Sequence, residues 1–374
     1  MVSWQLPPPV EEALWQAARD RLPAAALARG ALRDAVIARS RVYTSERELL
    51  DEVPPSAAAD LAARALFFTV ADAAKPMFAL AELAERGLLP ARAPLRVLDL
   101  GAGCGAMSLG VWAALREAGD TRRIEVVAVD RDAEALGIFA DAARILDPEL
   151  AVEKRVAELA GLQAAPGTVD LVVSGTTLNE LAPADRQALV AAAVRAIGDD
   201  GAVLLIEPAL RDTARALHEL RDWVIDSGTA HVFAPCTRTR TPCPALADAD
   251  DWCHEDRPTQ LPPRAAAMSR DTGLRRYGLK LAYLTLLRRP AVQVEADGAL
   301  VPLRVVSQPR KLKGRFELIA CGDGGRLPMR LLKRNRGAGN RAFERTARGD
   351  VLLCRETGEV ARADQVRLHA VDRS

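Results

Sequence analysis

The sequence predicts an α/β protein built around a Rossmann-like parallel sheet. Short apolar runs rich in β-forming residues recur from residue 95 onward, and segments of helical length separate them. Nearly continuous apolar strands joined by helices indicate a sheet that is covered on both faces. Closely spaced glycines follow the first of these runs, which is typical of nucleotide-binding folds of this class.

Seven strands are expected, and the last two should form an antiparallel pair at one edge of the sheet. Their expected positions are 95–100, 124–130, 151–156, 169–175, 202–208, 230–235 and 279–287. The run at 151–156 is the weakest of them, and a helix is expected at 210–226.

Three regions are expected along the chain. Residues 1–90 are rich in Ala, Leu and Arg, with apolar side chains at helical spacing, and predict a helical region. Residues 91–290 hold the sheet, which is interrupted by a cysteine-rich insertion at 236–278. Residues 291–374 contain short alternating runs such as GRFELIA and GDVLLC, which predict a small antiparallel β module.

The composition argues against a secreted or membrane-spanning protein. The opening residues, MVSWQLPPPV, have neither the basic start nor the apolar run of a signal peptide. The most apolar long stretch, 61–84, is interrupted by Arg64, Asp72 and Lys75, so no membrane span is expected. We therefore expect a cytoplasmic protein, in which thiols stay reduced and clustered cysteines are usually metal ligands or redox groups.

Charge is spread unevenly along the chain. The net charge is +1, but residues 301–374 hold 17 Lys or Arg against 8 Asp or Glu, which leaves +9 there and −8 elsewhere. Such asymmetry favours a tail that binds a polyanion such as RNA, although a solvated Arg-rich surface would give the same balance. The candidate phosphate contacts are Lys311, Lys313, Arg315, Lys333, Arg334 and Arg336.

The glycine-rich segment VLDLGAGCGAMSLG (97–110) lies between an expected strand and an expected helix. Glycine allows the backbone to turn sharply and approach a ligand closely. Gly101, Gly103 and Gly105 match the tight loop of S-adenosylmethionine-dependent methyltransferases. Gly101 and Gly103 with Ala106 also satisfy a relaxed dinucleotide pattern, so the loop alone does not select the cofactor.

Two acidic residues accompany this loop. Asp130 ends the second expected strand, where a carboxylate can accept hydrogen bonds from both ribose hydroxyls of an adenosine; the alternative is an N-cap of the next helix. Asp99 lies just before the loop, either near the methionine end of the cofactor or capping amides of the loop. With the expected antiparallel strand pair, these features favour S-adenosylmethionine and a seven-stranded methyltransferase fold.

The sequence carries no methyl-acceptor signature, so the catalytic residues are unassigned. The segment SGTTLNEL (174–181) follows the fourth strand, where amino-methylating enzymes often carry an Asn/Asp-Pro-Pro-aromatic motif. Asn179 and Glu180 are candidates for the substrate side, and Asn179 is also a candidate cap for the next helix. Cys236 is conceivable as a nucleophile for cytosine C5, but its neighbours favour metal ligation.

Three of the six cysteines fall within CTRTRTPCPALADADDWCHE (236–255). Their spacing, Cys236-x6-Cys243-x9-Cys253, matches neither a zinc ribbon nor a ferredoxin run. Three thiolates from one loop need a fourth ligand. The candidates for it are His254, Cys321 and Cys354. Thiolates suit an iron–sulfur cluster and zinc equally well.

The segments LIEPALRDTARAL, APCTRTRTPCP, DWCHEDRP, KLAYLTL and QPRKLKGRFELIACGDGG together resemble one family. This is the methyltransferase-like assembly factor family of the small ribosomal subunit, found in mitochondria and bacteria, and the resemblance covers about residues 92–355. It implies a [4Fe-4S] cluster held by Cys236, Cys243, Cys253 and Cys321. Two positions depart from the family pattern: Glu255 replaces an aromatic residue and Ala209 replaces a glycine.

Together these features predict an S-adenosylmethionine-binding, iron–sulfur-containing methyltransferase that acts on small-subunit rRNA or a pre-subunit. One alternative is a non-catalytic rRNA-binding assembly factor, which the missing acceptor motif keeps open. The other is a small-molecule methyltransferase with a structural zinc, which the basic tail disfavours.

Overall fold

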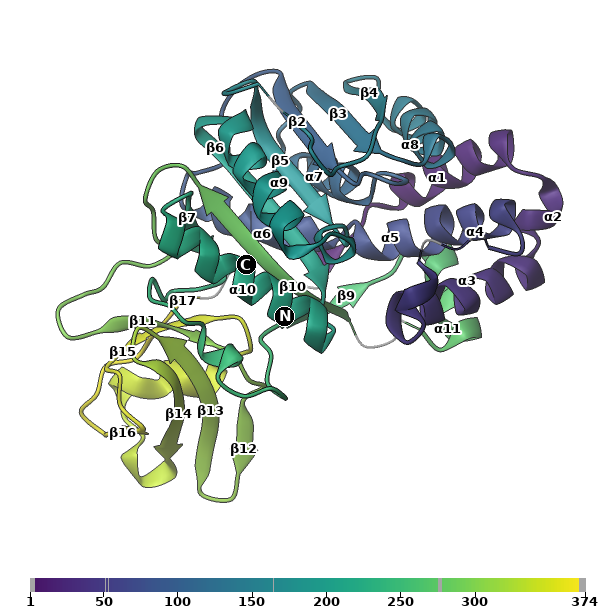
Figure 1. Ribbon diagram of the computed structural model, residues 1–374. Helices are drawn as coiled ribbons and strands as arrows, with labels where there is room; N and C mark the ends of the chain where they lie inside the picture. Colours follow the sequence, from purple (N-terminus) through teal and green to yellow (C-terminus); the bar gives the residue numbers. More distant parts are fainter. Residues whose placement is uncertain (1–3, 51, 53, 164, 275–277, 370–374) are drawn as a thin grey trace.

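The computed structural model describes residues 4–50, 52, 54–163, 165–274 and 278–369. The outer ends of the expected helical and basic regions, 1–3 and 370–374, and residues 275–277 of the insertion lie outside the described residues. Figure 1 shows a large α/β body with helices at one side and a smaller β module below it. Across the described ranges, no helix is long and apolar enough to cross a membrane.

The central sheet has the strand order β4-β3-β2-β5-β6-β10-β7, and β8 pairs with β10. The strands are β2 (Leu95–Leu100), β3 (Ile124–Asp130), β4 (Leu150–Val156), β5 (Val169–Gly175), β6 (Ile197–Pro208), β7 (His231–Ala234), β8 (Glu255–Arg257) and β10 (Leu279–Leu287). Neighbours from β4 to β6 pair in parallel, whereas β10 lies antiparallel between β6 and β7. This is the seven-strand arrangement of S-adenosylmethionine-dependent methyltransferases, so the predicted fold class is confirmed.

Helices cover both faces of the sheet because side chains alternate between faces along each strand. On β2, Val97 contributes to the core under the N-terminal helices, and the adjacent Leu98 contributes to the core on the opposite face. The helices that follow the strands are α7 (Ala106–Glu117), α8 (Ala133–Leu146), α9 (Pro183–Ala196) and α10 (Arg211–Ser227). The first two pack on the face that carries Val97, and the last two pack on the other.

The N-terminal helices lie beside the carboxyl edge of the sheet (Figure 1). They are α1 (Pro8–Arg21), α2 (Ala24–Leu27), α3 (Arg29–Thr44), α4 (Ala57–Ala63), α5 (Thr69–Asp72) and α6 (Lys75–Glu85). A π-helical turn, η2 (Arg64–Phe68), joins α4 to α5. Helix α1 packs on α8 and α6 packs on α7, so this region shares its hydrophobic core with the sheet.

The cysteine-rich insertion is more ordered than its polar composition indicates. After a short turn, η4 (Pro244–Leu246), it contributes β8 to the sheet and pairs β9 (Thr259–Gln260) with β1 (Trp4–Gln5). It ends in α11 (Pro263–Thr272), which packs on α3 and buries Ala265 and Met268. Its second half is therefore held by ordinary packing.

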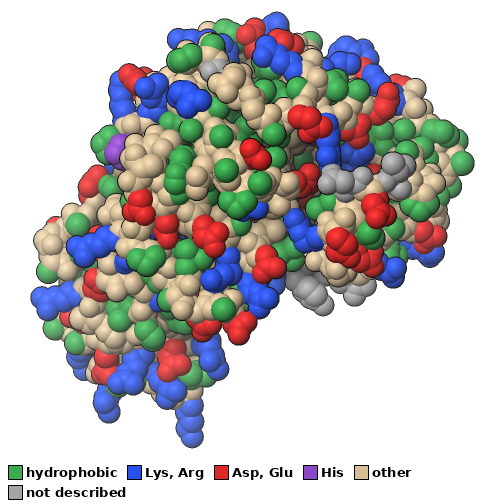
Figure 2. Space-filling view, in the orientation of Figure 1, with side chains coloured by type: hydrophobic (Ala, Val, Ile, Leu, Met, Phe, Trp, Pro, Cys, Tyr) green, Lys and Arg blue, Asp and Glu red, His purple; other side chains and the backbone are tan. Residues whose placement is uncertain are grey.

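The C-terminal module has its own sheet, with strand order β16-β14-β13-β11-β15-β17 and β12 paired to β13. Its strands are β11 (Val301–Val305), β12 (Arg310–Leu312), β13 (Arg315–Gly322), β14 (Gly325–Leu332), β15 (Val351–Cys354), β16 (Glu359–Val360) and β17 (Arg367–His369). The pair β14–β16 is parallel, so the module is not wholly antiparallel as predicted. Figure 2 shows basic side chains projecting from its far end, where β12 lies in Figure 1.

A buried polar network joins this module to the main body. Arg304 on β11 is 2% exposed, and its guanidinium donates to Glu82 Oε1 at 2.9 Å and to Glu255 Oε1 at 3.1 Å. It also donates to the hydroxyl of Tyr283 at 2.9 Å, and that hydroxyl donates to Glu82 Oε2 at 2.6 Å. Glu255, which departs from the family pattern, is therefore a buried partner of Arg304. Removing Arg304 would leave the carboxylates of Glu82 and Glu255 buried without their ionic partner, which is strongly destabilising.

Candidate functional site

The glycine loop turns from β2 into α7 in a conformation that only glycine adopts readily. Gly101 has φ 72°, and a Cβ there would lie 2.1 Å from Thr177 Oγ1. Gly103 has φ 50°, and its nearest neighbour in the Cβ direction is Asp130 Oδ2 at 4.0 Å. Gly105 packs against the ring of Phe139. The loop is thus closed on two sides and open towards Asp130.

Asp130 is bonded directly to this loop. Its Oδ2 accepts the Gly103 N–H at 2.8 Å and its Oδ1 accepts the Asp132 N–H at 2.8 Å. The N-cap of α8 is Asp132, which accepts from the amides of Glu134 and Ala135. The alternative role of Asp130 as that N-cap is therefore excluded. Each carboxylate oxygen has a second lone pair, which leaves capacity for the hydroxyls of a ligand.

Asp99 lies behind the loop. Its side chain is fully buried and accepts from the amide of Ser108 at 3.2 Å and from its hydroxyl at 2.6 Å. Burial raises the pKa of this carboxyl to about 7. The bonds of Asp99 go to Ser108 in the first turn of α7 rather than to amides of the loop, so the capping alternative has the expected kind of bond but a different partner. The contact of Asp99 with a cofactor stays a prediction.

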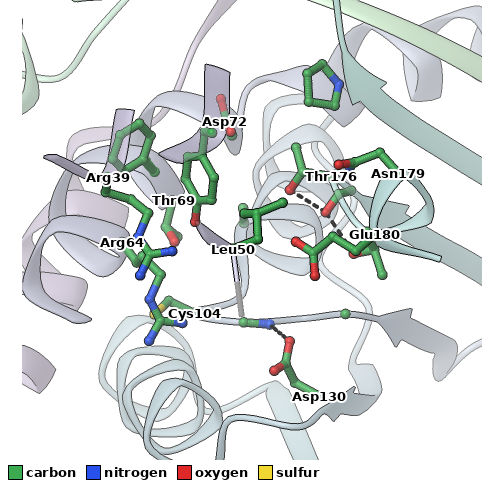
Figure 3. Close-up of a pocket in the computed structure, with 18 of the residues that line it drawn as sticks. Arg39, Leu50, Arg64, Thr69, Asp72, Cys104, Asp130, Thr176, Asn179 and Glu180 are labelled. Carbon is green, nitrogen blue, oxygen red and sulfur yellow. Dashed lines mark hydrogen bonds between the residues drawn. The ribbon is translucent and has the colours of Figure 1, made fainter. Parts of the chain in front are cut away.

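A cavity of about 780 Å³ lies above the loop. Figure 3 shows side chains from the N-terminal helices, the glycine loop and the segment after β5 converging on it. Residues that sequence reasoning did not assign to the site also line it, among them Arg39, Tyr43, Arg47, Arg64 and Lys280. In the sequence Arg39, Tyr43, Arg47 and Arg64 look like the polar face of ordinary helices, and Lys280 lies in an expected strand, so no local pattern marks them as cavity residues.

The cavity wall beyond β5 is built around a buried carboxylate. Glu207 of β6 accepts the amides of Thr177 at 3.1 Å and Leu178 at 2.9 Å, and the Asn179 side-chain amide at 2.6 Å. Burial raises the pKa of Glu207 to about 7. The N-cap of α9 is Ala182, so Asn179 does not cap that helix; it lines the cavity and accepts from Arg47. Thr176 has φ 58°, a strained value for a β-branched residue, at the same edge.

The four cysteines of the predicted metal site line a second, smaller cavity of about 40 Å³. They are Cys236, Cys243, Cys253 and Cys321. Burial raises the pKa of Cys243 to about 11, and raises it to about 12 for Cys253 and Cys321; the neighbouring Cys236 adds to each increase. Within the described ranges, no three His, Cys, Asp or Glu side chains are arranged to hold a single metal ion. The ligand set therefore stays a prediction.

The other two cysteines lie elsewhere. Cys104 is buried in the glycine loop, and Cys354 is buried in the core of the C-terminal module.

His254 lines the small cavity, as does His218, to which sequence reasoning gave no role. The Nε2 of His218 lies 3.0 Å from the amide nitrogen of Cys253 and accepts its hydrogen bond.

The cysteine loop also docks the C-terminal module. Thr237 donates its hydroxyl to the carbonyl of Cys321 at 3.1 Å, and Arg238 donates to the carbonyl of Gly322 at 3.3 Å. The amide of Thr239 donates to Asp323 Oδ1 at 3.1 Å. The turn that carries Cys321 is thus held against the loop that carries Cys236 by hydrogen bonds of its own.

Comparison with known proteins places the chain in a family. A family profile described as "Mitochondrial small ribosomal subunit Rsm22" matches residues 61–353. A search of curated protein sequences gave no significant match.

Three methyltransferases are among the similar solved structures. Phosphoethanolamine N-methyltransferase 1 of Haemonchus contortus is 18% identical over 47% of this chain and 32% of its own, with a TM-score of 0.28. A TehB-like methyltransferase of Corynebacterium glutamicum is 19% identical over 56% and 86%, with a TM-score of 0.31. Magnesium protoporphyrin IX methyltransferase of Synechocystis is 13% identical over 68% and 97%, with a TM-score of 0.35. On the strength of the profile match from α4 to β15, the protein belongs to the Rsm22 family of the mitochondrial small ribosomal subunit.

Proposed function

We propose that the protein binds S-adenosylmethionine above its glycine loop and methylates RNA of the small ribosomal subunit. The observation that carries this proposal is the bond between the Gly103 amide and Asp130 at the floor of the large cavity. A glycine-rich turn and a strand-end carboxylate that meet in one cavity are the two elements that an adenosine ligand needs.

The residues present fit this cofactor. The cavity lies within the usual size range of ligand pockets, roughly 300–1,000 Å³. Asp130 has lone pairs available for two ribose hydroxyls, and the Cβ direction of Gly103 is open for the close approach of a ligand. Ala157, Glu158 and Leu159, which follow β4, line the same cavity and are our candidates for contacts with the adenine.

When bound, S-adenosylmethionine supplies an electrophilic methyl group on a positively charged sulfur. The chain itself supplies the position of the acceptor. Thr176, Asn179 and Pro208 line the cavity at the ends of β5 and β6, the edge at which open α/β folds bind their ligands. Glu207 holds this edge in one conformation through its three hydrogen bonds to residues 177–179.

The basic end of the C-terminal module would contact RNA phosphates. Lys311 and Arg336 flank the ring of Phe316, with their charged groups 6.0 and 5.6 Å from its centre. The amide of Lys333 donates to the carbonyl of Gly314 at 2.9 Å, so the β12–β13 turn lies beside the end of β14. The six candidate phosphate contacts therefore share one exposed end of the module. Clustered Lys and Arg provide the sequence-independent part of RNA binding.

A [4Fe-4S] cluster bound by Cys236, Cys243, Cys253 and Cys321 is part of this proposal. Thiolates are the ligands that such clusters take, and all four thiols line one cavity. Arg221, Arg238 and Arg326 line the same cavity, and their charge would offset that of the cluster. Ligation would require the thiols to lose their protons, so metal binding and proton release are coupled. Zinc remains the alternative because it takes the same ligands.

A non-catalytic role in assembly is the second candidate, and one contact favours it. The side chain of Asn179 is engaged at both ends, by Glu207 and by Arg47, so it is not offered to an acceptor base in this conformation.

Methyl incorporation separates the two candidates. Precursor small subunits from a strain lacking the protein should accept labelled methyl groups from S-adenosylmethionine when the purified protein is added, and the Asp130→Ala variant should not support transfer. Binding of RNA and cofactor without any transfer would leave the non-catalytic role.

A further inference from the structure

We infer that the large cavity contains a built site for a zwitterionic α-amino-acid group, formed by Asp72 and Lys75 with support from Arg64 and Thr69. The inference rests on the proposed function, because the group would be the methionine end of the cofactor. It assigns that end to the N-terminal helices rather than to the glycine loop.

The first observation is a buried ion pair in the wall of a polar cavity. Lys75 is 1% exposed and Asp72 is 8% exposed, and both line the cavity. Lys75 Nζ lies 3.0 Å from Asp72 Oδ1. Burying two full charges costs several kcal/mol per ion before their attraction is counted. An ion pair of this kind therefore adds little to the net stability of the fold. A ligand with both charges would complement this pair.

The second observation is that the pair is rigidly placed beside the glycine loop. Gly110 of α7 is buried, and a Cβ there would lie 2.0 Å from the carbonyl oxygen of Ala73 and 2.5 Å from Pro76. The turn between Asp72 and Lys75 is therefore pressed against the helix that begins at the loop. The absence of a side chain at Gly110 makes this close approach possible.

A third observation is the irregular helix directly before the pair. The π-helical turn Arg64–Phe68 changes the register of the helix, and such turns are frequent at functional sites. Arg64 is the first residue of this turn and Thr69 directly follows it; both line the cavity. Arg64 is fixed by Asp60 at 3.1 Å and by Asp132 at 2.5 Å, and the side chain of Thr69 lies close enough to the Cys104 thiol to affect its pKa.

The arrangement gives the cavity two recognition ends. In Figure 3, Asp72 and Asp130 lie at opposite ends of the view, with Cys104 and Leu50 between them. A nucleoside bonded to Asp130 would therefore extend its 5′ substituent towards Asp72. The ammonium of the ligand would face Asp72, and its carboxylate would face Lys75 within the positive field of Arg64.

The test compares two ligands that differ only at this end. S-adenosylhomocysteine carries the amino-acid group, whereas 5′-methylthioadenosine has the same nucleoside and thioether without it. The double variant Asp72→Asn/Lys75→Met removes both charges at nearly constant volume, so neither member of the pair is left as a buried charge without the other. In calorimetry it should weaken S-adenosylhomocysteine by about tenfold or more, the scale of lost charge-assisted hydrogen bonds, and change 5′-methylthioadenosine by less than about twofold.

Controls make each outcome decisive. Asp130→Ala should weaken both ligands by a similar factor, and melting temperatures verify folding. If the double variant does not fold, Thr69→Val takes its place, with an expected loss of about two- to fivefold for S-adenosylhomocysteine alone. Equal losses for the two ligands, or no loss for either, would assign Asp72 and Lys75 a purely structural role and overturn the inference. A wild-type protein that binds neither ligand would instead overturn the proposed function, and this assignment with it.

Discussion

Trp252 donates its indole N–H to the carbonyl oxygen of Ala209 at 3.1 Å. Trp252 precedes Cys253 of the small cavity, and Ala209 lines the large one. The ring of Trp252 also stacks on His254, with centroids 5.9 Å apart. This single bond connects the two candidate sites through one side chain, so a change in the cysteine loop can reach the acceptor side of the cofactor cavity.

Replacing Trp252 by Phe tests this connection. The substitution keeps most of the aromatic packing and removes the hydrogen bond to Ala209, so cofactor affinity should fall by about 0.5–1.5 kcal/mol. Calorimetry with S-adenosylhomocysteine measures the change. Trp223→Phe on α10 is the matched control, since Trp223 packs against the same hydrophobic core as Trp252 and, in the part of the chain that the structure describes, is not among the residues that line either cavity. An equal loss in both variants would point to general destabilisation.

Asp130→Ala should weaken cofactor binding by about 1–3 kcal/mol, because it removes charge-assisted bonds to the ligand as well as the acceptor for the Gly103 amide. Asp130→Asn keeps one acceptor oxygen and should lose less. The measurement is a titration of each variant with S-adenosylhomocysteine and, separately, with NAD. Unchanged affinity for the first ligand, or tighter binding of the second, would contradict the assignment.

The positions of the strands were predictable because buried parallel strands leave a local signal. LRVLDL, IEVVAVD and VDLVVSG are nearly continuous apolar runs, and each forms the expected strand. The strand β6 extends from Ile197, before the expected start at 202, because Asp199 and Asp200 interrupt the apolar pattern without ending the strand.

Much of the site was not predictable, because its contacts join residues with no local relationship. The bond from Arg47 to Asn179 spans 132 positions, and that from Arg304 to Glu82 spans 222. Each arginine lies in a segment whose own pattern is an ordinary helix or strand. Only the tertiary arrangement shows that these side chains face a cavity or a buried partner.

Glu207 should give the protein a distinctive pH dependence. Its pKa is raised from 4.5 to about 7 by burial, so the folded state holds this proton more tightly than the unfolded chain. The stability that this provides is fully present below pH 4.5 and is lost as the pH rises to about 7, a total of up to about 3 kcal/mol. Asp99 acts in the same direction over a similar window.

Glu207→Gln isolates this contribution. Urea midpoints measured between pH 4.5 and 7.5 should fall less steeply with pH in the variant than in the wild type, whatever constant offset the altered bond to Asn179 introduces. Glu219→Gln, at an exposed position of α10, should leave the slope unchanged. Identical slopes in the wild type and Glu207→Gln would show that the carboxyl is not held neutral.

RNA binding should depend steeply on salt. Reversing Lys311 and Lys333 to Glu removes two phosphate contacts from the exposed end of the module, so the slope of log affinity against log salt should flatten by about two units or slightly less. Filter binding of small-subunit rRNA between low and high salt measures it. Reversing Arg144 and Arg195, two exposed arginines on the large domain, is the matched control. If the slope flattens equally in both double variants, the RNA is attracted by the overall charge of the protein and not by this end of the module.

The last prediction concerns the four cysteines. Protein purified without oxygen should be brown and contain about four irons per chain, the content of one [4Fe-4S] cluster. Cys321→Ser should lose the colour, whereas Cys354→Ser and Cys104→Ser should keep it, because those thiols are buried in separate cores. A colourless preparation with one zinc per chain would replace iron by zinc and keep the ligand set; full metal retention in Cys321→Ser would refute the ligand set.

The contacts of the insertion and of the C-terminal module predict which segments should stay folded in Cys321→Ser. Protease sensitivity should increase between residues 236 and 253, the part of the insertion that forms no strand or α-helix of its own in the described chain. Beyond it, β8 pairs with β10, and α11 is packed on α3, so cleavage there should not increase. The module should remain docked, because Arg304 stays bonded to Glu82 and Tyr283 without any metal. Release of the module in Cys321→Ser, seen as an expanded particle in small-angle scattering, would mean that metal ligation outweighs this buried network.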